Sequence, residues 1–289
     1  YLIPKPFDPR LMMKIAPAVA QAAADCGVAE RPIEDMDAYR EHLQTFVYAS
    51  GTAMKPIFMA AKKAAKKRVA YAEGEEERIL RAAQIVVDER IARPTLIGRP
   101  AVIAQRIEKF GLRLKEGADY DVVNVEHDER YRDFWQTYHQ MTERKGVTVP
   151  IAKIEMRRRL TLIGSMMLHK GQVDGLICGT WNNTAIHLHY IDQVIGKRAG
   201  AATYACMNGL LLPDRQVFLV DTHVNYDPTA EQLAEITIMA ADELTRFGIK
   251  PKVALLSHSN FGSSNQPSAV KMRQTLELLR IQAPWLEVD

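Results

Sequence analysis

Polar residues follow several of the expected strands, and one of these strand ends has the composition of an anion-binding loop. The segment reads Ser-His-Ser-Asn-Phe-Gly-Ser-Ser over residues 257–264 and stands between an apolar strand and a helix. Hydroxyl groups, backbone amides and a helix N-terminus can together hold a phosphate. The same serines could instead satisfy the end of the helix without any ligand. The candidate contacts in this loop are Ser257, Ser259, Asn260, Gly262, Ser263 and Ser264.

Three other strand ends are polar: Glu73-Gly74, Gly179-Thr180 and Asp221-Thr222-His223. Ligands of open α/β sheets gather beyond the carboxyl ends of the strands. A metal held by Asp221, His223 and Asp227 is the less favoured interpretation, because Asp227 is better explained as the N-cap of the next helix. We therefore predict no metal site.

Other catalytic patterns find no support in the residues. His187 and His189 are two positions apart, so on a helix they point to different faces and cannot form a metal pair. No Ser-His-Asp order or reactive Cys-His pair stands out. Neither a dinucleotide-binding glycine motif nor a Walker phosphate loop occurs, so nothing here supports nicotinamide or nucleoside triphosphate binding. We predict no catalytic residue and no cofactor held by this chain.

Alternating strands and helices must position these strand ends. Strands are expected at 68–72, 94–98, 121–125 and 174–178, and helices at 75–90, 100–110, 128–170 with a break near Gly146, and 183–195. This alternation predicts a mostly parallel sheet with helices on both faces. After a polar hinge at 196–200, we expect a hairpin of 204–212 with 217–220, a helix from Asp227 to Phe247, a strand at 252–256, a helix at 267–282, and the start of a further, unpartnered strand at 286–288.

Two helices precede the first strand and read as an appendage. The first runs from Asp8, a candidate cap, through an apolar stripe of Leu11, Ile15 and Val19 to Gly27. The second lies within residues 30–50.

Composition excludes several classes of protein. The apolar and charged fractions, 47% and 25%, are those of a globular protein, and the net charge of +3 gives no basic face for nucleic acid. The basic run at 62–68 is best explained as a solvated helix face. No signal peptide and no apolar run of about 20 residues occurs, so we expect a cytoplasmic protein without membrane contact. Three widely spaced cysteines predict buried, reduced thiols.

The strand ends resemble, in order, the motifs of the phosphate acetyltransferase (phosphotransacetylase) family. Residues 72–83 resemble its P-E-G-E-x-x-R-x-L-x-A-A opening, and residues 143–148 its R-x-K-G-x-T segment. Residues 174–179 resemble A-D-A-x-V-S-G, and Thr184-Ala185 falls on S-T-A-D. Residues 221–235 resemble D-x-x-V-N-x-x-P-x-x-x-x-L-A, and 257–264 resemble S-x-S-T-K-G-S-A.

The resemblance implies a fold, a ligand and a division of the chain. It implies an α/β protein of two αβα lobes with mostly parallel sheets and a cleft between them, a coenzyme A thioester as ligand, and a homodimer or higher homo-oligomer. Its motifs add Thr180, Asn183, Thr184 and His189 to the candidate ligand contacts. The lobes are expected at 51–197 and 198–289, the second without its C-terminal part.

The first 29 residues resemble the final segment of bacterial malic enzymes. A malic enzyme tail joined to a phosphotransacetylase-like domain is the arrangement of hybrid NADP-dependent malic enzymes. Because the chain also begins on Tyr1 rather than Met, we expect a piece of a longer protein, with 1–50 as tail and linker helices. The resemblance implies that NADP and a divalent Mg or Mn ion belong to the malic enzyme part, which is also a partner of this chain.

The departures from the family pattern concern charge. His189 and Tyr190 stand where the family has Arg-Pro, Asn260 and Phe261 stand where it has Thr-Lys, and Asn182 replaces a histidine. The family's catalytic serine, arginine and aspartate are expected beyond Asp289. Because acetyl transfer to phosphate needs cations that hold an anion, the sequence favours a domain that senses acetyl-CoA or a related acyl-CoA without catalysing transfer. An active phosphate acetyltransferase and a purely oligomerising module remain alternatives.

Overall fold

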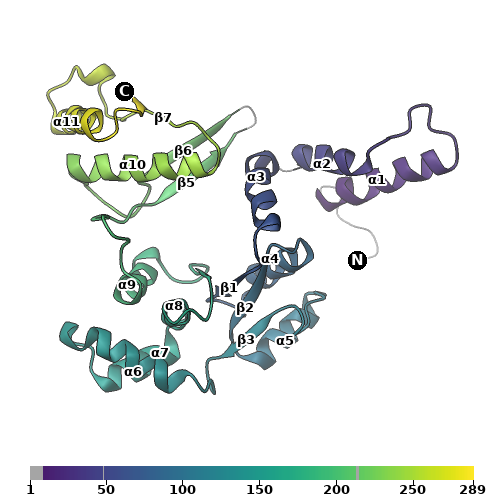
Figure 1. Cartoon of the computed structure of the whole chain (residues 1–289), viewed down its shortest axis with the longest axis horizontal. Coiled ribbons are helices and arrows are strands. Elements are labelled where there is room, and N and C mark those ends of the chain that lie inside the picture. The colour runs from purple at the N-terminus through teal and green to yellow at the C-terminus, as the bar shows by residue number, and fades with distance from the viewer. Residues whose placement is uncertain (1–8, 48, 213–214) are drawn as a thin grey trace.

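A computed structural model describes residues 9–47, 49–212 and 215–289. Its first three helices are α1 (Pro9–Asp25), α2 (Met36–Val47) and α3 (Ala49–Lys63). They extend to one side of the molecule, away from the main sheet (Figure 1). Gly27 follows α1 with a φ of 71°, as expected for a residue that ends a helix. The predicted cap Asp8 lies outside the described residues.

The apolar stripe predicted for the first helix is largely exposed at its centre. Ile15 and Val19 are 53% and 61% exposed. The 3.6-residue period therefore gives α1 an apolar face, but within the described residues α1 contacts α2 and no sheet covers that face.

The alternating block forms a four-stranded, all-parallel sheet, as predicted. Its strands are β1 (Lys67–Tyr71), β2 (Ala92–Gly98), β3 (Asp121–Asn124) and β4 (Gly175–Ile177), and their spatial order is β3-β2-β1-β4. Each strand is followed by helix, and the helices are α4 (Glu77–Asp88), α5 (Pro100–Lys109), α6 (Tyr131–Thr142), α7 (Val149–Arg158), α8 (Leu160–His169) and α9 (Thr184–Val194).

Alternate residues of the strands fill two cores on opposite faces of this sheet. Tyr71 and Leu96 pack with residues of α4 and α5 on one face. Ala70 and Ile97 pack with residues of α6 to α9 on the other. The period-2 pattern of a strand that is buried on both sides produces this arrangement. The first block is therefore an αβα layer structure, and both apolar faces of its sheet are covered.

The long helical region is broken twice, where the sequence predicts one break. Gly146 has a φ of 90° and ends a short 3-10 helix (Glu143–Lys145), at the predicted place. A second break occurs at Arg159, whose backbone is extended (φ −108°, ψ 94°) between α7 and α8. Arginine carries no break signal, so tertiary packing decides this boundary.

The second block has a hairpin and a small parallel pair. The predicted hairpin is present as the antiparallel strands β5 (Met207–Leu211) and β6 (Gln216–Val220). The other elements are α10 (Ala230–Arg246), β7 (Lys252–Val253), α11 (Pro267–Gln282) and β8 (Glu287–Val288). The final strand, expected without a partner, pairs in parallel with β7. The α/β class and its parallel central sheet are thus confirmed, whereas the described strands of the second block form two separate two-stranded sheets.

Two local predictions are wrong for identifiable reasons. Asp227 does not cap the following helix; it pairs with Lys271 instead. Thr229 is the cap, in a capping box with Gln232 whose side chain accepts from the Thr229 amide at 2.9 Å. The cysteines are not buried: Cys26 is exposed and Cys178 and Cys206 are half-buried, all as free thiols. Scarcity of cysteine indicates the absence of a disulfide framework but says little about burial.

Within the described ranges, no helix combines the length and the apolar character that a membrane span requires.

Candidate functional site

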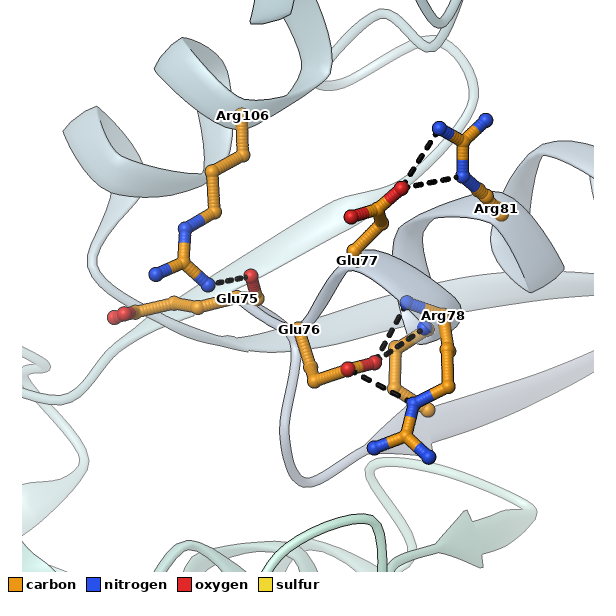
Figure 2. A network of polar contacts seen from close by, with 7 residues as sticks. Glu75, Glu76, Glu77, Arg78, Arg81 and Arg106 are labelled. Carbon is orange, nitrogen blue, oxygen red and sulfur yellow. Dashed lines mark hydrogen bonds and ion pairs between the residues drawn. The ribbon is translucent and has the colours of Figure 1, made fainter. Parts of the chain in front are cut away.

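The end of β1 is fixed by a glycine and a glutamate. Gly74 donates its amide to the Ile97 carbonyl on β2 at 3.1 Å, and a Cβ at residue 74 would lie 2.8 Å from the Ile97 nitrogen. Glu75 accepts from the Arg99 amide at 2.8 Å and from its guanidinium at 2.8 and 2.9 Å. Arg106 donates to the Glu75 carbonyl oxygen (Figure 2). The motif's glycine and second acid thus position the β1 and β2 ends.

Arg99 lowers the pKa of Glu75 through hydrogen bonds and charge, against the opposing effect of burial. A lowered folded-state pKa stabilises the fold above the unfolded-state pKa, near 4.3 for glutamate, and this contribution is lost as the pH falls through the folded value. We expect Glu75→Gln to lower the free energy of unfolding by about 1 kcal/mol at pH 7, because Arg99 is half-exposed. The difference from the unmodified chain should shrink below about pH 4. Urea unfolding at both pH values measures it.

Glu77→Gln is the matched control. Glu77 pairs with Arg81 one turn along the surface of α4, as Figure 2 shows, and both side chains are nearly half-exposed. Its loss should change the free energy of unfolding by less than about 0.5 kcal/mol at either pH. Equal effects of the two substitutions would contradict a structural role for the Glu75–Arg99 pair.

The segment after β4 is held in place by buried polar groups of the first block. Glu73, 2% exposed, accepts from the Gly179 amide at 3.1 Å through Oε1, and its Oε2 has no described partner. The Nε2 of His187 lies 2.6 Å from the Trp181 carbonyl, which can only accept, so Nε2 carries the proton. The His187 Nδ1 lies 2.7 Å from the Thr161 hydroxyl. His187 therefore has a structural role, because both ring nitrogens are bonded within the protein.

The candidate residues of this segment lie beside that anchor. Asn183 is the N-cap of α9 and its side chain accepts from the Ile186 amide at 3.1 Å. Thr180 is half-buried, whereas Thr184 and His189 are exposed. Tyr190 is buried and donates its hydroxyl to Glu155 at 3.0 Å. Of the two positions that depart from Arg-Pro, only His189 thus presents a side chain to solvent.

The 257–264 loop is organised by its own side chains and by α11. The Ser257 and Ser259 hydroxyls lie 3.1 Å apart. His258 lies 3.2 Å from the Ser264 hydroxyl and 3.1 Å from that of Ser268. Ser264 also accepts from the Gln266 amide, as the helix-end interpretation expects. No bond is described for the Ser263 side chain, which is exposed.

The Arg273 guanidinium reaches this loop and donates to its backbone carbonyls. Arg273 on α11 donates to the carbonyl oxygen of Gly262 and, at 2.6 Å, to that of Ser264. Phe261, where the family pattern has lysine, is 94% exposed with a φ of 47° between Asn260 and Gly262. The described residues 257–264 therefore present hydroxyls, amides, the His258 imidazole and the Phe261 ring, but no lysine or arginine side chain of their own.

The structure gathers the predicted residues into two groups. Thr180, Asn183, Thr184 and His189 surround the start of α9, and the serine loop precedes α11. Within the described residues, no hydrogen bond or ion pair joins the two groups, and α10 and the hairpin lie between α9 and α11 (Figure 1). A pocket of about 330 Å³ lies at the hinge, lined by residues of 196–207, β6 and α10 and by none of the predicted contacts. The cleft between lobes stays a prediction.

The Asp221 segment is a structural turn. Asp221 accepts from the amides of Cys206 at 3.0 Å and Asn225 at 2.7 Å. Burial raises its pKa, but these hydrogen bonds outweigh burial and lower it. Among the described residues, no group of three or more histidine, cysteine or acidic side chains is arranged to hold a metal ion.

Sequence reasoning missed three positioning residues: Arg99, Thr161 and Arg273. For Arg99 a signal existed. Glu75 follows β1 and Arg99 follows β2, and these two strands are parallel neighbours. An acid and a base at such adjacent strand ends are expected to form an ion pair. Thr161 lies on α8 and Arg273 on α11, and threonine and arginine are common residues on helices, so the sequence does not mark either one.

Comparison with known proteins places the chain among phosphotransacetylase-like sequences. The family model described as phosphate acetyl/butaryl transferase matches residues 52–289. The NADP-dependent malic enzyme of Salmonella typhimurium is 53% identical over the whole chain, which spans 38% of that relative's length. A phosphate acetyltransferase of Synechocystis is 35% identical over 229 residues, covering 78% of this chain and 32% of its own. A solved phosphotransacetylase from Streptococcus pyogenes has a TM-score of 0.72 at 25% identity, covering 82% of this chain and 71% of the other.

Proposed function

The chain belongs to the phosphate acetyl/butaryl transferase family, and from that membership we propose that it is a regulatory acetyl-CoA-sensing domain of an NADP-dependent malic enzyme, without transacetylase activity of its own. Residues 1–50 are then the end of the malic enzyme part and a linker, and residues 51–197 and 198–289 are the two lobes. The parent protein would oxidise and decarboxylate malate to pyruvate. NADP and the divalent metal would be bound outside this chain.

The relatives support the malic enzyme context. The Salmonella malic enzyme matches all 289 residues, including α1, α2 and the first residues of α3, which precede the family match at residue 52. The phosphate acetyltransferase of Synechocystis matches 78% of the chain. The malic enzyme relative thus shares both the family domain and the helices before it, which supports a domain fused to a malic enzyme.

The observation that carries the non-catalytic part of the proposal is the charge at the serine loop. Transfer of an acetyl group to phosphate develops negative charge that cations such as arginine and lysine stabilise. Here Phe261 occupies the exposed position of the family's lysine, and Arg273 is bonded to backbone carbonyls. Amides and hydroxyls suffice to bind a phosphate-bearing ligand. Arg273 keeps its charge, but its Nη1 donates to the loop's own carbonyls, so no lysine or arginine of the loop is left to contact the transition state.

Regulation would follow from unequal binding. Acetyl-CoA lowers malic enzyme activity if it binds more tightly to a less active state of the whole protein, by an amount equal to the coupling free energy. Contacts between subunits can transmit such coupling, because they can differ between the two states. We therefore propose that the domain also contributes to a homodimer or higher homo-oligomer.

Arg273→Gln tests the loop as the binding element. Arg273 holds the loop's shape through two carbonyls and is a positioning residue, so its loss should weaken acetyl-CoA binding about tenfold without unfolding the chain. Calorimetric titration of the chain with acetyl-CoA measures the affinity, and circular dichroism the fold.

Arg280→Gln, on the same helix and exposed, is the control and should bind as the unmodified chain does. Equal binding by both variants would exclude the loop as the site. Absence of acetyl-CoA binding to the unmodified chain would contradict the sensing function itself.

The 35% identity to a phosphate acetyltransferase supports one competing function, an active transferase. Formation of acetyl phosphate from acetyl-CoA and phosphate distinguishes the two. We expect none above the uncatalysed rate; sustained turnover would favour the transferase.

A further inference from the structure

A surface groove between α6 and α7 is separate from the predicted acetyl-CoA contacts. Its volume is about 670 Å³. Tyr131, Arg132 and Trp135 contribute from α6, and Lys153 and Arg157 from α7. In Figure 1, α6 and α7 lie at the opposite end of the molecule from α11 and the serine loop. The volume is within the range of about 300–1,000 Å³ found for small-molecule sites.

Two of the cations are held against the aromatic rings. The Lys153 Nζ lies 4.6 Å from the centre of the Trp135 ring, and the Arg157 Cζ lies 4.6 Å from that of Tyr131. The Tyr131 hydroxyl also donates to the Lys153 carbonyl at 2.8 Å. Tyr131 and Trp135 are four residues apart on α6, and Lys153 and Arg157 are four residues apart on α7, which places the two rings on one face of α6 and the two cations on one face of α7. The rings thus orient the cations without neutralising them.

The positive charge of the groove is not balanced by neighbouring acids. Arg132, Lys153 and Arg157 form no ion pair within the described part of the chain, and no acidic side chain lines the groove. Other cations close by are paired: Arg130 with Asp128 at 2.6 Å and Lys170 with Asp133 at 2.8 Å. Three uncompensated cations around one concave, aromatic surface favour an anion that has a flat or apolar body.

We propose that this groove binds a nucleotide, with its phosphates at Arg132 and Arg157 and its base against the aromatic side. Guanidinium groups bind phosphate oxygens through paired hydrogen bonds. Trp135, and Ile154, which is 53% exposed, supply the surface for a base. Recognition would use side chains of two helices and no glycine-rich loop, which is why motif patterns do not detect it.

ATP is the probe, and tryptophan fluorescence is the readout. We expect ATP to quench the fluorescence of the 289-residue chain saturably, and Trp135→Phe to abolish the response, since the other two of its three tryptophans lie elsewhere. Arg157→Gln should weaken ATP binding about tenfold, as measured by calorimetry, from the loss of one charged phosphate contact. Adenosine and inorganic triphosphate should each bind more weakly than ATP, because each lacks half of the contacts.

Arg158→Gln is the matched control, because Arg158 is the next residue of α7, exposed, and does not line the groove. It should leave ATP affinity unchanged. Equal loss in both arginine variants, or no saturable response to ATP, would overturn the proposal. A poly-glutamate peptide that binds as tightly as ATP would also overturn it, in favour of an acidic protein partner. Arg273→Gln should leave the ATP response unchanged, which separates this proposal from the acetyl-CoA function.

Discussion

Replacing Gly74 with alanine should destabilise the chain by about 3 kcal/mol, the upper part of the usual range for overpacking. The added Cβ would lie 2.8 and 2.9 Å from the backbone nitrogen and oxygen of Ile97, and 2.9 Å from the Leu96 Cβ. Backbone atoms of a central strand cannot move aside as a flexible side chain can. The β1 end would shift and break the bond from the Gly74 amide to Ile97. Urea unfolding monitored by circular dichroism measures the loss.

Gly175→Ala is the control within the same sheet. A Cβ there would meet only the Val69 Cγ2 at 3.9 Å, an ordinary contact, so we expect a change within about 0.5 kcal/mol. If Gly74→Ala proved as harmless as Gly175→Ala, the close approach of the β1 end to β2 would be contradicted.

Tyr138→Phe should lower the free energy of unfolding by about 2 kcal/mol, because it leaves the half-buried Glu155 and Gln193 side chains without this partner. Tyr138 is fully buried, and its hydroxyl lies 2.9 Å from a Glu155 carboxylate oxygen and 2.6 Å from the Gln193 side chain. Burial and the Glu155 carboxylate raise the pKa of Tyr138, so the hydroxyl stays protonated across the working range of pH. The network joins α6, α7 and α9. Thermal unfolding and urea titration both report its loss.

Tyr131→Phe removes a hydroxyl from the same helix at a half-buried position where water can replace the lost partner. We expect a change below about 0.5 kcal/mol. Similar costs for both tyrosines would show that the Glu155 network adds little to stability.

The fold of the first block could be predicted from the sequence because the strand pattern and the helix pattern there indicate the same layered sheet. Ala70 with Tyr71, and Leu96 with Ile97, alternate between two covered faces, and the intervening helices carry apolar stripes of the right period. Parallel pairing then follows from the connections, and the ends of β1 and β2 fall side by side.

Other features required three-dimensional information. The break at Arg159 has no local signal, and the exposure of Ile15 and Val19 depends on what lies next to α1, which periodicity does not reveal. In the second block the strand expected at 252–256 is shorter than predicted, because only Lys252 and Val253 pair with β8. Short pairings of this kind carry too few side chains for an alternating pattern to develop.

The candidate site, too, was predicted in part from the sequence and in part required the structure. The sequence identified strand ends and polar types, and the structure shows which polar groups have partners. Asn183 caps a helix, Ser257 and Ser259 bond to each other, and Ser264 bonds to His258 and the Gln266 amide. Ser263, Thr184 and His189 remain exposed. Partners such as Arg273 come from helices whose relation to the loop no local pattern encodes. The candidate side chains that have no hydrogen-bond partner within the described part of the protein are therefore the ones most open to a ligand.

The rate of malate-dependent NADP reduction by the full-length protein, with and without acetyl-CoA, tests the proposed function most directly. We predict that acetyl-CoA lowers the rate and that Arg273→Gln requires about tenfold more acetyl-CoA for the same inhibition. Arg280→Gln should behave as the unmodified protein. A rate that does not respond to acetyl-CoA would contradict a sensing domain, whatever the chain's affinity for the thioester.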